Sequence, residues 1–288
     1  MLLSGKEVAR SVYDAIAKDY VKHKHRACPK LVIIQVGDNA ASSVYVRNKI
    51  RAVSAMGFVA EHQVFAATAS SAEIRDFIQR CNTDPTVHGI LLQLPLPAAL
   101  KPQTYALVES IAAEKDVDGL TTKSLGQLAS NALHYENHIP CTALAVVKLL
   151  EYANIPIQGS HAVVVGASNI VGKPCAMALL SMRATVSVCH SKTTDLASFV
   201  RQADILIVAI GNPHVIQPEW LHKDQVVIDV GINHDSDGKL IGDIPKEAQD
   251  LVKILTPVPG GVGPMTVACL VHNLYHLYQQ SYEKKPTV

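Results

Sequence analysis

Tyr45 and Lys49, four positions apart, are the first residues in this sequence whose types and spacing could do chemistry. They fall in a segment predicted to be helical, so their side chains project from one face of that helix. An aromatic ring beside an amine could stack against a flat substrate and present a base to it. The same spacing fits an ordinary amphipathic helix with a lysine at its surface, and the spacing alone leaves both interpretations open.

Gln93 and Asp118 are two further polar residues at positions where an α/β fold binds ligands. Gln93 ends a strand predicted at 87–92, and Asp118 lies in a turn that follows a predicted helix. Ligands of open parallel sheets bind outside the carboxyl ends of the strands. We therefore consider both residues candidates for a site, although Asp118 could equally be a helix cap or a turn residue.

A glycine turn at Gly166 separates a predicted strand from a predicted helix. The apolar run 162–165 is typical of a buried parallel strand, and 171–180 is rich in Ala, Met and Leu. Helix N-termini in this setting bind phosphate groups through free N–H groups and the helix dipole. The strict G-x-G-x-x-G pattern is absent, because Ser168 occupies the second glycine position and Gly172 is displaced by one. A turn that serves only strand–helix packing is the alternative.

The next predicted strand, at 185–189, ends in a segment that bears on cofactor choice. Proteins that bind NAD usually place an acidic residue here, where it binds the ribose hydroxyls. This sequence has no acid at that point and has Ser191 and Lys192 instead. A hydroxyl and an amine could accept the 2′-phosphate of NADP.

Alternation of helical and strand patterns predicts two α/β series. The first comprises helix 5–22, strand 30–37, helix 42–56, strand 58–65, helix 71–81, strand 87–92 and helix 102–113. Region 120–138 is predicted to be a connection, and 142–152 a linking helix. The second comprises strand 162–165, helix 171–182, strand 185–189, helix 195–202 and strands 205–209 and 226–230, before a helix at 265–278. The expected class is α/β, with two α/β domains flanking a cleft, the second a Rossmann-like doubly wound parallel sheet.

Composition excludes several classes of protein. The 288 residues favour two domains, and a net charge of +1 provides no field to attract nucleic acid or a membrane surface. The six scattered cysteines form no C-x-x-C pair, and the histidines show no metal-ligand spacing. No signal peptide or membrane-spanning run is found. We expect a cytoplasmic enzyme with reduced thiols and no metal.

Eight motifs in order along the chain resemble the bifunctional methylenetetrahydrofolate dehydrogenase/methenyltetrahydrofolate cyclohydrolase family. They are YVRNK (45–49), GILLQLPLP (89–97), KDVDG (115–119), PCT (140–142), VVVGASNIVGKP (163–174), TVSVCHSKT (185–193), VIDVGIN (227–233) and TPVPGGVGPMTVA (256–268). The resemblance implies NADP-dependent oxidation of methylenetetrahydrofolate to methenyltetrahydrofolate, then hydrolysis to formyltetrahydrofolate, in one-carbon metabolism. It implies a folate-binding catalytic domain at 1–138 plus 270–288, a dinucleotide-binding domain at 139–269, and a homodimer formed through the nucleotide domain.

The resemblance also assigns roles to individual positions. Lys49 matches the catalytic lysine and Gln93 its partner, while Tyr45 stacks on the pterin and Asp118 is the pterin-binding acid. The residues that match the folate-contacting loop are Pro259 and Gly260. The positions that match the lining of the dinucleotide site are Gly166, Ser168, Ser191, Ile232, Gly263 and Thr266, to which we add Lys192.

One departure from the family pattern concerns the cofactor. The family commonly has an arginine after Gly166 that binds the 2′-phosphate, and this chain has Ala167. Ser191 and Lys192 favour NADP, and the loss of the arginine makes NAD an alternative. Other departures, such as Gly242–Lys246, lie outside the Lys49–Gln93 pair. A family member with one activity and a non-catalytic nucleotide-binding module are the competing interpretations.

Overall fold

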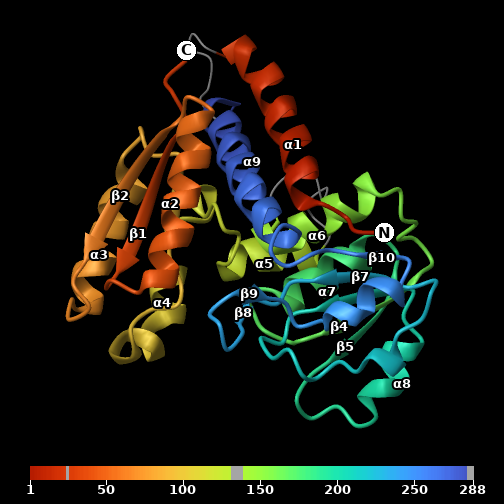
Figure 1. Ribbon diagram of the computed structural model, residues 1–288. Helices are drawn as coiled ribbons and strands as arrows, with labels where there is room; N and C mark the ends of the chain where they lie inside the picture. The colour runs from red at the N-terminus through yellow and green to blue at the C-terminus, as the bar shows by residue number, and fades with distance from the viewer. Residues whose placement is uncertain (24–25, 131–138, 284–288) are drawn as a thin grey trace. The chain divides into compact units, whose positions relative to one another are not determined.

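A computed structural model describes residues 1–23, 26–130 and 139–283 of the chain. The described chain divides into two compact units, each built on its own parallel sheet, which confirms the predicted α/β class (Figure 1). The three-stranded unit comprises chiefly Val12–Gln127 and the residues from Leu270 onward, and the five-stranded unit chiefly Met1–Ser11 and Thr142–Cys269. Met1–Ser11 thus groups with the five-stranded unit, whereas the sequence-based boundaries assign it to the first domain. Those functional boundaries stay a prediction.

The three-stranded unit has the strand order β2-β1-β3, with all strands parallel. The strands are β1 (Lys30–Val36), β2 (Val59–Phe65) and β3 (Gly89–Leu92). β1 is the central strand and is buried along its length after Lys30, which explains its unbroken apolar run. Helix α2 (Ala40–Ala55) packs along β1 and β2 (Figure 1), and helix α3 (Ser71–Thr83) begins at a capping box.

The connections after β3 differ from the sequence-based expectation. The chain forms a 3₁₀ helix (Ala98–Gln103) that contains Pro102, then a short helix α4 (Thr104–Glu109) and another 3₁₀ turn (Ala113–Lys115). The helix predicted at 102–113 is therefore present only as the shorter α4, and the segments on either side of it are 3₁₀ rather than α-helical. Helix α5 (Thr122–Ala129) occupies part of the region predicted to be a connection, so that prediction is also wrong there; 131–138 lies outside the described residues.

Two longer helices lie near the ends of the sequence. They are α1 (Gly5–Tyr20), which continues as a 3₁₀ turn (Val21–His23), and α9 (Val262–Glu283). Within the three-stranded unit the Tyr275 hydroxyl of α9 donates a hydrogen bond of 2.8 Å to Asp19 of α1. The two helices run side by side at this point (Figure 1).

The five-stranded unit has the strand order β10-β7-β6-β4-β5, again all parallel. The strands are β4 (His161–Val165), β5 (Thr185–Cys189), β6 (Ile205–Val208), β7 (Val226–Asp229) and β10 (Ile254–Leu255). Numbered along the chain within this unit, the order is 2-1-3-4-5, a doubly wound sheet whose connections reverse direction between β4 and β6. That reversal, the topological switch point, is where such folds bind their ligands.

The remaining elements of this unit cover or extend the sheet. They are helices α6 (Cys141–Tyr152), α7 (Gly172–Ser181) and α8 (Leu196–Arg201), 3₁₀ turns at Pro218–Trp220 and Lys246–Asp250, and the hairpin of β8 (Asn233–His234) and β9 (Leu240–Ile241). The sequence did not predict β8, β9 or β10, because each has only two residues and shows no periodicity.

Candidate functional site

Helix α2 presents Lys49 to the carboxyl end of β3. The Lys49 Nζ donates a hydrogen bond of 3.0 Å to Gln93 Oε1. The Gln93 amide nitrogen donates to the Leu94 carbonyl at 2.6 Å, and its backbone N–H donates to Ile34 at 2.8 Å. Gln93 is therefore fixed at both ends, and it holds the amine through a neutral oxygen.

Tyr45 lies one helical turn before Lys49 on the same helix and is half-buried. Burial raises the pKa of the Tyr45 phenol above its ordinary value. The phenol therefore stays neutral across the physiological range. Its ring can serve as an uncharged surface for a flat ligand.

The turn that carries Asp118 is built by a different carboxylate, Asp116. The buried Asp116 accepts hydrogen bonds from the N–H groups of Gly119 (3.0 Å) and Thr121 (2.8 Å) and from the Ser124 hydroxyl (2.8 Å). Gly119 has a φ of +72°, which favours glycine. The half-buried Asp118 carboxylate makes no hydrogen bond or ion pair with the described part of the chain. Asp116 thus has the turn role considered for Asp118, whose carboxylate is left available.

A buried asparagine supports the same turn from helix α9. The Asn273 amide donates to the carbonyls of Val117 (3.1 Å) and Ile139 (3.0 Å), on either side of the Asp118 turn. A parallel bridge pairs Ile90 of β3 with Asp116. Because the two segments run in the same direction, Asp118, two residues after Asp116, lies at the level of the carboxyl end of β3.

The glycine turn after β4 lies at the switch point of the five-stranded sheet. Gly166 has a φ of +123°, and its N–H donates to the Cys189 carbonyl at 2.9 Å. A Cβ at Gly166 would collide with the Ala209 carbonyl, at the end of β6, and a Cβ at Gly172 would collide with the Gly166 carbonyl. Gly172 therefore lets helix α7 approach β4 closely, which is the part played by the third glycine of dinucleotide-binding turns.

Ser168 caps helix α7. Its hydroxyl accepts hydrogen bonds from the N–H groups of Val171 (3.2 Å) and Gly172 (3.4 Å), and its carbonyl accepts from Lys173 (3.0 Å). Ser168 therefore accepts from N–H groups at the start of α7 that the sequence alone would assign to a bound phosphate. The N–H groups of 167–170 make no hydrogen bond with the described chain, so they are the donors this turn offers to an anion.

The turn at 190–193 carries Ser191 and Lys192. Strands β4 and β5 pair up to their last residues, so this turn adjoins the turn at Gly166. It is closed by hydrogen bonds of 2.9 and 2.8 Å between its first and last residues. Ser191 and Lys192 are both exposed at its tip, where they can meet a ligand that lies along the carboxyl edge.

Three further candidates for the dinucleotide site lie on other segments of the same unit. Ile232 is exposed in the short segment between β7 and β8, directly before β8. Gly263 and Thr266 lie in the first turns of α9, where the Thr266 hydroxyl donates to the Gly263 carbonyl at 2.8 Å. Their part in binding stays a prediction.

The loop with Pro259 and Gly260 is held by the start of the chain. The Gly5 N–H donates to the Gly260 carbonyl at 2.9 Å, and a Cβ at Gly5 would collide with the Gly261 carbonyl. Pro259 is exposed at the surface of this loop. The structure thus gives the loop a defined backbone, and its contact with folate stays a prediction.

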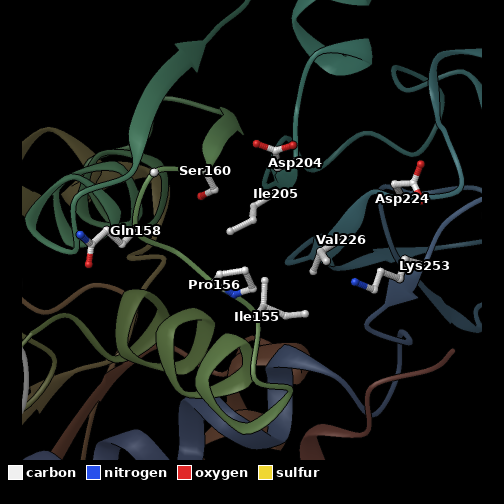
Figure 2. Close-up of a pocket in the computed structure, with 10 residues that line it drawn as sticks. Ile155, Pro156, Gln158, Ser160, Asp204, Ile205, Asp224, Val226 and Lys253 are labelled. Atoms are coloured by element: carbon white, nitrogen blue, oxygen red, sulfur yellow. The ribbon is translucent and has the colours of Figure 1, made fainter.

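A depression of about 320 Å³ lies in the five-stranded unit (Figure 2), and none of the candidate residues described above lines it. Its lining includes Ser160, Asp204 and Lys253, each directly before a strand of the sheet. It therefore marks the amino ends of the strands, opposite to the edge where such sheets bind ligands.

In the described ranges no helix is long and apolar enough to cross a bilayer, and no three His, Cys, Asp or Glu side chains gather as a metal site would need.

Comparison with known proteins agrees with this geometry. The tetrahydrofolate dehydrogenase/cyclohydrolase catalytic domain matches residues 3–118, and the NAD(P)-binding domain of the same family matches 140–282. The chain belongs to the tetrahydrofolate dehydrogenase/cyclohydrolase family. The resemblance drawn from the sequence motifs is confirmed.

Relatives of this family resemble the chain over nearly its whole length. The bifunctional protein FolD of Lysinibacillus sphaericus is 44% identical over 274 residues, which cover 94% of this chain and 95% of that protein. The crystal structure of FolD from Campylobacter jejuni has a TM-score of 0.91 at 39% identity and covers 97% of this chain and 99% of its own. The Trypanosoma brucei enzyme, complexed with NADP cofactor and an inhibitor, has a TM-score of 0.91 at 33% identity and covers 98% of each chain.

The loop after β6 also adjoins the Gly166 turn, although the sequence motifs did not indicate it. Ala209 lies against Gly166, and Gly211 follows with a φ of +71°. A signal was present in the sequence, because the turn residues Gly211, Asn212 and Pro213 directly follow a buried strand. Nothing in the local pattern identified the two buried carboxylates, Asp229 and Asp243, that hold this edge of the sheet.

Proposed function

We propose that this protein oxidises methylenetetrahydrofolate to methenyltetrahydrofolate with NADP and then hydrolyses that product to formyltetrahydrofolate. The observation that carries the proposal is the hydrogen bond of 3.0 Å between Lys49 and Gln93, in the unit that also holds Asp118. An amine in a neutral setting suits the proton transfers of the hydrolysis. Relatives named bifunctional FolD, at 44% identity, support both activities.

For the oxidation, the protein mainly needs to align the folate with the dinucleotide. When bound, the dinucleotide supplies the acceptor for the hydride that leaves the methylene bridge. The Tyr45 ring offers a stacking surface for the pterin, and the Asp118 carboxylate can accept hydrogen bonds from pterin N–H groups. The turn at Gly166 fits a dinucleotide, because it lies at the switch point and its N–H groups at 167–170 make no hydrogen bond with the described chain. Holding both reactants in line is a large part of the catalytic effect.

The hydrolysis asks for proton transfer. Water attacks the methenyl carbon of the cation and forms a C–O bond, and one proton of the water is released to solvent. The ring then opens as one C–N bond breaks, and the other proton of the water is transferred to the folate nitrogen that leaves the carbon. Lys49 Nζ is the group we assign to this transfer, with Gln93 holding it in place. Because Gln93 is neutral, it orients the amine without placing a negative charge beside it.

Cofactor choice rests on the exposed turn after β5. Ser191 and Lys192 are exposed in a turn that adjoins the Gly166 turn, which supports a role in binding a 2′-phosphate. The segment 189–193 contains no acidic residue to bind the free hydroxyls of NAD. Ala167 brings no guanidinium to the site. These features support NADP, held by Ser191 and Lys192.

A paired initial-rate assay with methylenetetrahydrofolate, using NADP in one sample and NAD in the other, tests the proposal. We expect faster turnover with NADP, and we expect Lys192→Gln to lower the NADP rate while the NAD rate is unchanged. Faster turnover with NAD would show that Ala167 has switched the cofactor. Turnover with neither, in a sample that still hydrolyses methenyltetrahydrofolate, would leave only the cyclohydrolase.

We also propose a homodimer formed through the five-stranded unit. β5 is the edge strand of its sheet and Val188 on it is 41% exposed, which leaves a strand that could pair with a second copy. We expect Val188→Lys to shift the protein to a monomer in sedimentation velocity. Val64→Lys, on the edge strand β2 of the other sheet, is the matched control and should leave the sedimentation coefficient unchanged. A monomeric wild-type protein would overturn this proposal.

The cytoplasmic location stays a prediction. No disulfide joins any two of the six cysteines, all of which lie among the described residues, and this fits a reducing compartment. Five of them are buried, so their thiols are shielded from oxidants and metals.

A further inference from the structure

Two loops leave the carboxyl edge of the five-stranded sheet side by side, and one buried carboxylate ties them together. β6 and β7 pair up to Val208 and Asp229, so the segments that follow emerge as neighbours. Asp243, which is fully buried, accepts hydrogen bonds from the N–H groups of Ile210 (2.6 Å) and Gly211 (2.9 Å) through Oδ2. Its Oδ1 accepts from the Asn233 side chain at 2.8 Å.

A second buried carboxylate holds Asp243 in turn. Asp229, at the end of β7, accepts hydrogen bonds from the N–H groups of Gly231 (2.8 Å), Asp243 (3.0 Å) and Ile244 (2.9 Å). A Cβ at Gly231 would collide with Asp243, so the backbone approaches this pair as closely as glycine allows. The two carboxylates therefore fix three segments of the chain against one another.

This arrangement carries an electrostatic cost. No lysine, arginine or histidine in the described ranges forms an ion pair with either carboxylate, and backbone amides supply most of the compensation. Burial raises the pKa of Asp229 to about 6, and the charge of Asp243 acts in the same direction, although the amide hydrogen bonds oppose the rise. Apolar packing could hold these loops without burying charge, so the carboxylates are explained better by the geometry they impose.

The loops held by Asp243 are those that border the switch point. Ile210 and Gly211 directly follow Ala209, whose carbonyl contacts the Gly166 turn. Asn233 directly follows Ile232, a candidate for contact with the dinucleotide. Thus Oδ2 of Asp243 holds the loop at 209–211 on one border of the proposed dinucleotide site, and Oδ1 holds the loop that carries Ile232 on the other.

We propose that Asp243 is a positioning residue for the dinucleotide. Its side chain sets the distance between the loop at 209–211 and the loop that carries Ile232. The inference rests on the proposed use of a dinucleotide. Asp243 touches no ligand itself, and it acts through the backbone of the first loop and the Asn233 amide. Loss of either connection lets one border of the site move away from the other.

The test is a graded set of variants, with the dissociation constant for NADP measured by titration calorimetry. Asn233→Ala removes the hydrogen bond between Asn233 and Asp243 Oδ1. Asp243→Asn removes the same hydrogen bond, because it places one amide nitrogen opposite another and both are donors. We expect each to raise the Kd about ten-fold, and Asp243→Ala, which removes both connections, to raise it about a hundred-fold. His234→Ala changes the exposed neighbour of Asn233 and should keep the wild-type Kd.

Hydrolysis of methenyltetrahydrofolate provides a readout that needs no dinucleotide. We expect the variants that fold to keep this activity while their Kd rises, which a merely destabilising change would not produce. Asn233 is only half-buried, so Asn233→Ala keeps the test available if Asp243→Ala does not fold. A wild-type Kd in both Asn233→Ala and Asp243→Asn would overturn this inference alone. Absence of dinucleotide binding in the wild-type protein would overturn the proposed function, and this inference with it.

Discussion

Replacing Lys49 with methionine should reduce the hydrolysis of methenyltetrahydrofolate by a factor of about 10² to 10⁴, the usual contribution of a positioned acid–base group. Methionine keeps the unbranched apolar stem and removes only the amine that donates to Gln93 Oε1. The substitution lies in the three-stranded unit, so the Kd for NADP should stay at the wild-type value. The measurement is the loss of methenyltetrahydrofolate absorbance, corrected for the uncatalysed reaction.

The control for this variant is Arg51→Met on the same helix. Arg51 is exposed on α2 and also exchanges a cation for methionine, so the pair separates loss of a particular amine from loss of positive charge. We expect Arg51→Met to have wild-type activity. Full cyclohydrolase activity in Lys49→Met would show that another group transfers the proton, and the assignment of Lys49 would be withdrawn.

Gly172→Ala should raise the Kd for NADP about a hundred-fold, on the scale of a misplacement of the binding groups by 1 Å. A Cβ at this position would collide with the Gly166 carbonyl. The atoms that it would meet belong to the backbone of Gly166 and Ala167, so no flexible side chain can move aside to make room. Helix α7 or the turn at Gly166 must therefore shift, and the free amides at 167–170 shift with it. Dehydrogenase activity should fall with the affinity, while methenyltetrahydrofolate hydrolysis stays near the wild-type rate.

Gly126→Ala is the matched control for the glycine substitution. Gly126 lies in helix α5, and a Cβ there would meet no atom within 4 Å. Alanine also has the higher helix propensity, so this variant should be as stable as the wild type or more stable. Calorimetric titration of both variants with NADP compares them directly. Equal Kd values would mean that close packing of α7 on β4 has no part in dinucleotide binding.

The sequence predicts the sheets of this protein better than their connections. Central strands such as β4 and β6 are buried on both faces, so their apolar runs are unbroken and easy to recognise. Helix α5 escaped recognition because its signal is a short cap, in which the Ser124 N–H donates to the Thr121 hydroxyl, rather than a long periodic pattern. β10 has two residues and exists only through its pairing with β7, which is a tertiary effect.

The candidate site is predictable from sequence where the type and position of a single residue suggest a chemical role. Lys49 and Gln93 lie 44 positions apart in sequence, and each was a candidate from its own surroundings before the structure joined them. Asp243 was not, because its importance lies in the backbone groups it accepts from, and these come from segments more than thirty residues away. A single sequence does not record which distant amides a buried carboxylate will meet.

The hydrogen bonds from Asn273 have a consequence for the order in which the molecule forms during synthesis. Its amide supports the carbonyl of Val117, 156 positions earlier in the chain, next to Asp118. Because a ribosome releases the chain from its N-terminus, the strands beside this turn are available long before Asn273 emerges. The turn that presents Asp118 is thus completed only after the chain as far as Asn273, 156 positions beyond Val117, has left the exit tunnel. A nascent chain can already hold the Lys49–Gln93 pair while the support for Asp118 is still missing.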